Sequence, residues 1–495
     1  MRFFRNIKLM LPLLFLSAVA VSCINESEVP NSEREKLSLE AWIRINKPEL
    51  LDNYQENGGY YVEVLYDGGT GEGVSTDGND FGTENIMDQD TCWVFSNMTG
   101  RDINGTICVT RNRALAEMCG TFSYYTHYVP YVNYSGSVNM GLLEGSYLAM
   151  RNELKIGDGT LKLRKGSKVR LYLPSSIGYG ESGSAAEGGY EGQYALDASR
   201  PLIWDVEVLR TIKNPSDLEL GMVESFIGYE SGWIKAEKSE EEKTDEDKDL
   251  ILKGLYYNYD YTPDGGVLHE RYLQPHAEGI YNMYSDNKKY DDMEALNDTI
   301  NKILLKRFGK GLSKSERNDN NLVKKGGRAK VWYMLRFLDG FVVDTNIAEI
   351  RTLVFDEATP SCEVFSYSPS DDDGKDSEER SAIGAWYYCI PKMHFGAWGQ
   401  IATTSGYAYG ASGISGTTTT ETSSSNSSYY NALNYYNYYN SYYNYYSPYY
   451  NYYDYSYYNY NYSISDEETT TTTTIGTEIL PYTPLVFTLF VEPNE

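Results

Sequence analysis

The chain reads VRLYLPSSIGYG over Val169–Gly180 and then, after an interruption, PLIWDVEVL over Pro201–Leu209. A second copy of this pattern reads GQIATTSGYAYG over Gly399–Gly410 and PLVFTLFVE over Pro484–Glu492. In both copies a strand runs into a Tyr-Gly turn, and a later strand carries an indole or phenyl ring. The repetition predicts two tandem domains. In each domain the phenol and the ring can face one another across a pocket, which is typical of a binding site.

Length and charge limit the possible functions. The 495 residues suffice for two domains. The formal net charge is -27, with 70 acidic against 43 basic residues. A negative field of this size repels nucleic acid and anionic lipid surfaces, so we exclude DNA and RNA as partners.

The N-terminus resembles a bacterial lipoprotein signal. Basic residues precede the apolar run Leu9–Val21, and Ala20-Val21-Ser22 leads into Cys23. This run is too short to span a bilayer comfortably. We therefore expect residues 1–22 to be a signal peptide and Cys23 to be lipidated, with an ordinary cleaved secretory signal as the alternative. The mature chain is then lipid-anchored to the outer membrane of the cell envelope, on its periplasmic side or at the cell surface.

The remaining cysteines and the histidines form no pattern typical of a metal site. Five cysteines besides Cys23 are scattered without a Cys-x-x-Cys pair, and the four histidines are dispersed. A Cys92–Cys108 disulfide can form in an oxidising compartment, but buried free thiols are favoured. No Ser-His-Asp, phosphate-loop or paired-carboxylate signature is present. We expect neither a metal nor a cofactor.

Composition divides the chain into segments. A polar stretch after the signal contains one amphipathic helix around Glu33–Ile45, and the charged run EEEKTDEDKD at Glu240–Asp249 marks a solvated linker. The predicted segments are a tether with an N-terminal helix (23–57), a first domain (58–212), an acidic linker (213–250) and a second domain (251–495) with a low-complexity insertion (411–480).

Few helices, several short alternating strands and sequential hairpins predict an α+β fold built on antiparallel sheet. For the first domain we expect strands at Tyr60–Tyr66, Val169–Leu173 and Ile203–Leu209, a hairpin with arms Asp90–Phe95 and Gly105–Thr110, and a short helix at Leu142–Met150. For the second we expect a helix at Asp291–Phe308, a hairpin of Ala329–Leu338 and Phe341–Asp344, a charged surface loop at Asp371–Glu379 and a short helix at Ile383–Met393.

A segment of unusual composition follows the second Tyr-Gly turn. Residues 417–429 are rich in Thr and Ser, residues 429–462 contain nineteen tyrosines separated mainly by Asn and Ser, and six threonines follow at 469–474. Such a segment lacks the aliphatic residues and the periodicity that a core requires. We expect either a disordered repeat expansion or an aromatic flap that stacks on peptide or glycan.

Each half of the chain resembles an FKBP-type peptidyl-prolyl cis-trans isomerase domain, through short motifs within residues 58–212 and 251–495. In that family a half-wrapped antiparallel sheet packs on a short helix and leaves an aromatic pocket for proline. The hairpin carries a Tyr and a Phe-Asp pair, the helix start an Ile and a Trp floor, the turn a rim Tyr, and the last strand a Phe. The resemblance therefore implies two FKBP-like domains, the second with a long disordered Tyr/Asn-rich insertion.

The second domain matches this pattern closely. The matching residues are Tyr333 on the hairpin, Val343-Asp344 for the Phe-Asp pair, Ile383 and Trp386 at the helix, Tyr409 at the rim and Phe487 on the last strand. The resemblance implies a Trp386 floor under the proline ring, with walls from the other rings and Val343. It also implies that the Tyr409 hydroxyl and the Ile383 amide donate to substrate carbonyls, while Asp344 holds the hairpin. As alternatives, the rings are core residues and Asp344 is a turn cap.

The first domain departs from the pattern. The replacing residues are Met98 for the hairpin Tyr, Ile107-Cys108 for the Phe-Asp pair, Leu143 for the Ile and Ser146 for the floor Trp. Tyr179 at the rim and Trp204 on the last strand persist, and the resemblance assigns both to substrate binding. These losses predict a degenerate module with weak or no catalysis.

The resemblance implies a lipid-anchored prolyl isomerase that assists the folding of envelope or exported proteins, with its activity mainly in the second domain. Its partners would be proline-containing peptides or unfolded proteins. One alternative is a catalytically weak FKBP-like lipoprotein that acts as a peptide, protein or glycan binding module. Another is a surface lipoprotein whose Tyr/Asn tract self-associates.

Overall fold

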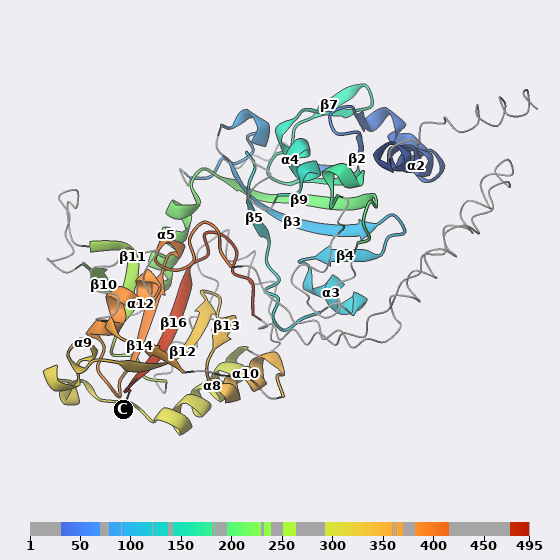
Figure 1. Ribbon diagram of the computed structural model, residues 1–495. Helices are drawn as coiled ribbons and strands as arrows, with labels where there is room; N and C mark the ends of the chain where they lie inside the picture. The colour runs from blue at the N-terminus through green and yellow to red at the C-terminus, as the bar shows by residue number, and fades with distance from the viewer. Residues whose placement is uncertain are drawn as a thin grey trace, which may run out of the picture.

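The computed structural model describes residues 31–69, 79–90, 92–120, 122–136, 142–180, 183, 196–228, 232–238, 251–263, 293–358, 360, 362, 364–369, 382–414 and 476–494. Within these ranges the chain forms two halves, each built on a seven-stranded antiparallel sheet (Figure 1). The predicted α+β class with antiparallel sheet is therefore confirmed. No helix in the described ranges is long and apolar enough to cross a membrane.

The first sheet has the strand order β1-β2-β8-β9-β3-β4, and β5 pairs with the N-terminal part of β3. Its strands are β1 (Tyr54–Gln55), β2 (Tyr60–Asp67), β3 (Trp93–Asp102), β4 (Ile107–Thr110), β5 (Tyr131–Tyr134), β8 (Ser167–Leu173) and β9 (Leu202–Ile212). A separate hairpin consists of β6 (Leu154–Ile156) and β7 (Gly159–Leu161).

The second sheet repeats this order as β10-β11-β15-β16-β12-β13, with β14 paired to β12 as β5 is to β3. Its strands are β10 (Ile234–Glu237), β11 (Ile251–Asn258), β12 (Ala329–Phe337), β13 (Val342–Thr345), β14 (Phe365–Tyr367), β15 (Trp398–Thr403) and β16 (Leu485–Pro493).

The registers of the two sheets correspond around the candidate sites. Trp204 on β9 lies opposite Gly100 on β3, and Phe487 on β16 lies opposite Leu335 on β12. Trp204 and Phe487 therefore hold equivalent positions. This correspondence is used below to match the two candidate sites.

A short helix packs against each sheet and contributes to the largest apolar cluster of its half. These helices are α4 (Glu144–Arg151) and α12 (Gly384–Cys389). The other helices are α2 (Asn31–Asn46), α3 (Arg113–Cys119), α5 (Pro215–Gly228), α8 (Met293–Phe308), α9 (Val323–Gly326) and α10 (Ala348–Phe355). Short 3-10 turns at Ser175–Ile177 and Ser405–Tyr407 precede the two Tyr-Gly turns.

Strand β16 is covered on both faces. Successive side chains of a strand point to opposite sides of the sheet. Phe487 and its alternate neighbours accordingly join the cluster with α12, whereas Val486 packs with α5 and Phe490 with α8. Burial of both faces explains why the strand is almost wholly apolar, and it fixes Phe487 on the face of α12.

The range 213–250, which we expected to form an acidic linker, holds α5 and β10. Strand β10 pairs with β11, and α5 packs on the second sheet through Val223 and Phe226. The first sheet has the same arrangement, because α2 packs on it through Leu39 and Ile43 and β1 pairs with β2. Each repeated unit thus begins with a helix and an edge strand. The charged run at 239–250 lies outside the described residues.

The two helices α2 and α5 also make the same polar contact. Glu35 on α2 accepts hydrogen bonds from the backbone N–H and the hydroxyl of Ser175, both at 2.5 Å. Glu219 on α5 accepts them from the N–H and the hydroxyl of Ser405, at 2.8 and 2.9 Å. In both halves a buried carboxylate therefore holds the turn that leads to the Tyr-Gly pair.

Several predicted elements need correction at their ends. The first hairpin was expected to have Asp90–Phe95 as one arm, but β3 extends to Asp102, and only Thr99–Arg101 pairs with β4. The Asn104-Gly105 turn, with Gly105 at φ 93°, lets the strand continue to that point. The helix predicted at Ile383–Met393 stops at Cys389 and is followed by a separate 3-10 turn, Ile390–Lys392, that contains Pro391. The predicted loop at Asp371–Glu379 lies outside the described residues.

The five cysteines of the described ranges are free thiols, so the Cys92–Cys108 disulfide is not formed. Cys92, Cys108 and Cys389 are buried, whereas Cys119 and Cys362 are partly exposed. The alternative of buried free thiols holds for these three side chains.

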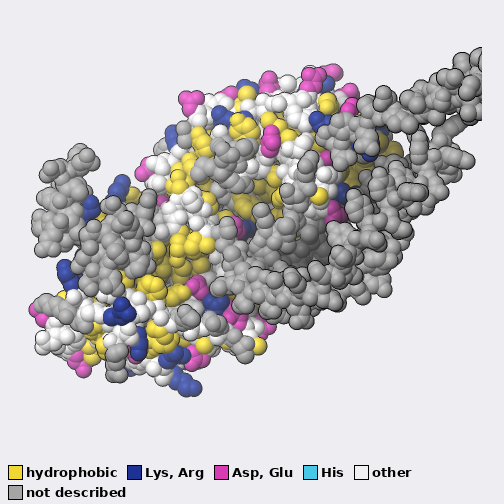
Figure 2. All heavy atoms as spheres, viewed as in Figure 1, with side chains coloured by type: hydrophobic (Ala, Val, Ile, Leu, Met, Phe, Trp, Pro, Cys, Tyr) yellow, Lys and Arg dark blue, Asp and Glu magenta, His cyan; other side chains and the backbone are white. Residues whose placement is uncertain are grey.

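The two halves touch each other around α5. Leu218 and Met222 on α5 pack in a cluster with Trp93 and Phe95 of the first sheet. Tyr482, which precedes β16, meets the Trp93 ring edge-on with the centroids 4.8 Å apart. On the face shown in Figure 2, hydrophobic side chains gather between the two halves.

Candidate functional site

The hairpin of the second half places a phenol and a carboxylate side by side. Tyr333 lies on β12 and Asp344 on β13, where a bulge follows Leu335. The Tyr333 hydroxyl donates to Asp344 Oδ2 at 2.5 Å. Burial, and then the neighbouring charge of Asp344, raise the pKa of Tyr333 well above its ordinary value. Tyr333 therefore stays a neutral donor.

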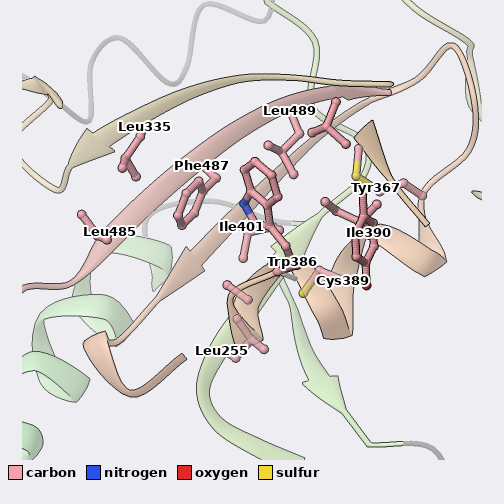
Figure 3. Close-up of a cluster of buried hydrophobic side chains, with 14 of the residues drawn as sticks. Leu255, Leu335, Tyr367, Trp386, Cys389, Ile390, Ile401, Leu485, Phe487 and Leu489 are labelled. Atoms are coloured by element: carbon pink, nitrogen blue, oxygen red, sulfur yellow. The ribbon is translucent and has the colours of Figure 1, made fainter. Parts of the chain in front are cut away.

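Helix α12 supplies the aromatic floor. Ile383 is its N-cap residue, and Trp386 follows in the first turn. The Trp386 ring meets the rings of Tyr333, Phe365 and Phe487 edge-on, with centroids 5.5, 5.1 and 5.8 Å away. Figure 3 shows the indole rising from the helix toward Phe487 on β16. Edge-to-face contacts of this kind fix the orientation of the rings.

The indole N–H of Trp386 is buried and has no hydrogen-bond partner among the described residues. The Trp386 side chain itself is 7% exposed. Eight other buried side-chain atoms of the described residues also have no partner, so this N–H alone does not mark a ligand site.

The rim of this cluster is the Tyr-Gly turn. Gly410 has φ 64°, and its N–H donates to the Ser405 carbonyl at 2.8 Å, which closes the turn and presents Tyr409. Tyr409 is partly buried and packs against the cluster. Burial, and then the charge of Asp344, raise the pKa of Tyr409 to about 12. The phenol is thus a neutral hydrogen-bond donor close to Asp344.

The structure brings the predicted residues of the second half together. Trp386, Phe487 and Val343 are buried members of one cluster, and Tyr333, Ile383 and Tyr409 are partly buried against it. Asp344 is bonded to Tyr333, and its side chain is 39% exposed. A buried apolar floor, a carboxylate and two phenols therefore meet at one place on the surface of this half.

Two residues of this site were missed from the sequence. Phe365 on β14 adds a ring beside Trp386, and Arg351 on α10 donates from Nη1 to Asp344 Oδ1 at 2.8 Å. The alternation in Glu363-Val364-Phe365-Ser366-Tyr367 is a strand signal that could have located Phe365. Nothing in the local sequence points to Arg351, because its contact depends on how the helix packs.

The corresponding site of the first half is arranged differently. The match of helix starts places Ser146 where α12 has Trp386, as predicted, and Trp204 stands where β16 has Phe487. The Trp204 indole N–H donates to Ser146 Oγ at 2.8 Å, and the side chain is 4% exposed. The indole thus comes from the strand in the first half and from the helix in the second.

Gly100 makes room for the moved ring. A Cβ added to Gly100 would lie 2.7 Å from Cζ3 of Trp204, whereas the equivalent position of the second half is Leu335. Tyr179 keeps the rim position and meets Trp204 edge-on at 6.3 Å. The Trp204 indole thus fills the space between sheet and helix from inside the protein.

The prediction for the hairpin of the first half was wrong by one position. Gly100 pairs with Val109, as Leu335 pairs with Asp344, so Val109 and not Cys108 takes the place of the acid. Both hairpins carry a bulge at the same place, so the spacing from Met98 to Val109 equals that from Tyr333 to Asp344, and counting along the sequence would have located Val109. Cys108 corresponds to Val343.

The ion pair of the second half is absent from the first. Helices α3 and α10 both start three residues after the matching threonines, Thr110 and Thr345, so Ala116 corresponds to Arg351. With Val109 in place of Asp344, both charges are replaced by apolar groups. An unpaired charge in a partly buried site is costly, which explains why the two are lost together.

A separate cavity of about 40 Å³ lies where the halves meet, lined among others by Arg111, His127 and Asp339. Its charged groups already have partners, because Arg111 pairs with Glu478 and His127 Nε2 lies 2.7 Å from Asp339 Oδ2. We therefore assign this cavity to the interface and not to the candidate site. Among the described residues, no group of three or more His, Cys, Asp or Glu is placed to hold a metal ion. The predicted lipidation site, Cys23, lies outside the described residues.

No protein-family model matches the sequence, and no curated protein matches it. Among solved structures, the three FKBP domains of wheat FKBP73 align with 88% of this chain and 95% of their own, at 12% identity and a TM-score of 0.19. FkpA from Escherichia coli aligns with 42% of this chain and 71% of its own, at 16% identity and a TM-score of 0.23. A peptidyl-prolyl cis-trans isomerase from Pseudomonas syringae pv. tomato aligns with 38% of this chain and 98% of its own, at 18% identity and a TM-score of 0.22. At these identities and TM-scores the similarity carries no argument about function, and the case for a function rests on the site.

Proposed function

We propose that the second half is an FKBP-type peptidyl-prolyl cis-trans isomerase domain. The observation that carries the proposal is the Trp386 floor, enclosed by Tyr333, Phe365 and Phe487, with Asp344 and Tyr409 at its edge. These groups suit a proline ring and the polar carbonyls on either side of it. The neighbouring apolar core keeps the floor dry.

Such a site can act on an X-Pro bond without a covalent nucleophile. The bond favours trans by only about 0.5–1 kcal/mol, but rotation faces a barrier of roughly 18–20 kcal/mol that arises from amide resonance. Water stabilises the charge-separated form of the amide and so strengthens the resonance. An apolar pocket removes that water and binds the twisted amide better than either planar form.

Each side chain then has a defined task. Trp386 lies under the pyrrolidine ring, while Phe487 and Tyr333 border it together with Val343. The neutral Tyr409 hydroxyl and the Ile383 N–H donate to the carbonyls that flank the proline. Asp344, held by Tyr333 and Arg351, keeps its carboxylate fixed beside the twisting carbonyl.

The direct test is the rate of cis-trans exchange of an X-Pro peptide, measured by NMR with the full chain. We expect the chain to accelerate the exchange, and Trp386→Ala with Tyr409→Phe to reduce kcat/KM at least about tenfold, or about 1.4 kcal/mol. Tyr407→Phe, in the same turn, is the matched control and should retain the rate. An inactive chain, or a double variant as fast as the natural protein, would refute the assignment.

A second candidate function is a binding module without catalysis. The filled site of the first half, with Trp204 bonded to Ser146, favours it for that half. Tyr179 remains partly exposed there and can still contact a peptide. Peptide binding by the full chain without any acceleration of exchange would support this alternative.

The cellular setting is part of the proposal. A lipid on Cys23 would anchor the chain in the outer membrane, where it would assist the folding of envelope or exported proteins rich in proline bonds. Metabolic labelling with a palmitate analogue should mark the natural chain and not a Cys23→Ala variant. Equal labelling of both would contradict the anchor.

A further inference from the structure

A loop of the first half reaches the second half beside the candidate site. Within this loop, Tyr125 stacks on Phe355 of α10, with the centroids 4.7 Å apart and the planes at 5°. Two residues later, the His127 ring stacks on Phe337 at 4.4 Å. The first contact holds the loop against α10, the helix that carries Arg351, and the second holds it against β12.

The hydroxyl of Tyr125 starts a chain of polar contacts. It donates to Glu357 Oε1 at 2.7 Å, and Glu357 Oε2 accepts from Arg351 Nε at 2.9 Å. Arg351 Nη2 also donates to Glu357 Oε1, so the carboxylate accepts two hydrogen bonds from one edge of the guanidinium. The other edge, through Nη1, donates to Asp344 Oδ1 at 2.8 Å.

The chain of contacts ends in the site itself, because Asp344 Oδ2 accepts the Tyr333 hydroxyl. A planar guanidinium held at Nε and Nη2 has only one direction left for Nη1. Arg351 is also buried, at 9% exposure, so water does not replace these contacts. The position of Asp344 thus depends on Glu357, and the position of Glu357 depends on a phenol from the other half.

We propose that Tyr125 of the first half is a positioning residue for the isomerase site of the second half, acting through Glu357 and Arg351 on Asp344. The inference rests on the proposed function and adds a role for the first half. A half whose own pocket is filled by Trp204 then contributes to catalysis by orienting the carboxylate of its neighbour.

The first half contains no equivalent of this relay. Val109 and Ala116 stand where Asp344 and Arg351 would be, so no carboxylate there needs orienting. The relay is therefore directed one way, from the first half to the second.

The test is a double-mutant cycle on the full chain. Tyr125→Phe keeps the ring stack and removes only the hydroxyl, and we expect kcat for an X-Pro peptide to fall three- to tenfold while KM stays within twofold. In an Arg351→Ala background the same change should have no further effect, because the relay is already broken. The matched control is Tyr124→Phe, since Tyr124 is 44% exposed and its ring meets Phe122 of the same loop edge-on.

Two outcomes would overturn the inference. One is an unchanged kcat in Tyr125→Phe, and the other is an equal loss in both backgrounds, which would show that Tyr125 acts independently of Arg351. Hydrogen exchange of the segment Val342–Phe355 provides a readout that needs no catalysis. Faster exchange in Tyr125→Phe than in Tyr124→Phe supports the relay even if the natural chain proves inactive, and equal exchange contradicts it.

Discussion

The two halves have the same strand order, an equivalent short helix and an equivalent Tyr-Gly turn. The tryptophan between sheet and helix, however, comes from different elements in the two halves. The second half has Trp386 on the helix and Phe487 on the strand, whereas the first has Ser146 on the helix and Trp204 on the strand. The exchange leaves the core filled in both cases. In the first half the indole is bonded to the helix from the strand, so the space between sheet and helix is filled from inside the protein.

The two halves also differ in an ion pair, and again both partners differ together. The second half keeps Asp344 and Arg351 together, and the first replaces both with Val109 and Ala116. Removing one partner of such a pair would leave a charge without compensation, whereas removing both is nearly neutral. The first half therefore has the same fold without this charged pair.

The largest expected effect comes from building the arrangement of the first half into the second. A triple variant, Leu335→Gly with Trp386→Ser and Phe487→Trp, should fold and lose its acceleration of X-Pro exchange, because its own indole would occupy the pocket. NMR exchange rates measure the acceleration, and thermal unfolding shows whether the variant folds. The double variant without Leu335→Gly should unfold earlier, since Gly100 is what admits Trp204. A triple variant with the natural rate would break the comparison.

Asp344→Asn should have the next largest effect. It removes the charge that Arg351 and Tyr333 hold, and hydrogen bonds to charged groups contribute about 1.5–3 kcal/mol, so kcat/KM should fall about tenfold or more. Asp356→Asn is the control, because Asp356 is exposed and Asn tolerates its left-handed backbone at φ 60°. Equal rates for Asp344→Asn and the natural chain would remove Asp344 from the site.

Ser146→Ala should affect stability and not activity. It leaves the Trp204 indole N–H buried without a partner, which costs about 1–3 kcal/mol in the free energy of unfolding. Urea unfolding measures the loss, and Ser216→Ala, at an exposed serine of α5, serves as the comparison. A loss of isomerase activity in Ser146→Ala would place catalysis in the first half instead.

The smallest effect concerns Glu219 and pH. Burial raises the pKa of Glu219 above its ordinary value of 4.5, although the bonds from Ser405 oppose the shift. A raised pKa means that Glu219 contributes stability below pH 4.5, and that this contribution is lost as the pH rises through the folded-state pKa. Relative to Glu219→Gln, which does not titrate, the natural chain should become less stable from pH 4 toward pH 7. Urea midpoints across this range check the trend, and a constant difference would contradict it.

Much of the second site could be predicted because its residues sit in short motifs, some repeated within the chain and others resembling those of the FKBP family. Trp386 follows a helix start, Tyr409 precedes a glycine in a turn, and Phe487 lies on an apolar strand. Phe365 and Arg351 were missed, since their places depend on packing between elements far apart in sequence. The one-residue error at Cys108 could have been avoided, because the spacing from Met98 to Val109 equals that from Tyr333 to Asp344.

The fold was predicted as a class, but its repeat unit was not. Helix α5 and strand β10 belong to the second sheet, although the acidic run beside them suggested a linker. The high charge is confined to the run Glu240–Asp249 and does not extend to α5, which has an apolar face. Matching Glu35 with Glu219 would have revealed the unit, but a single shared carboxylate on two helices is too weak a signal in sequence.

The pairing of Ile414 with Ile479 has a practical consequence. The two backbones bond to each other in both directions, at 2.8 and 2.9 Å, directly after the Tyr409 turn. This pair fixes both ends of the inserted segment next to the Tyr409 turn, and a longer insert should cost little, since loop-closure entropy grows only slowly with length. The segment between Ile414 and Ile479 is therefore a suitable place to insert a reporter domain or an affinity tag.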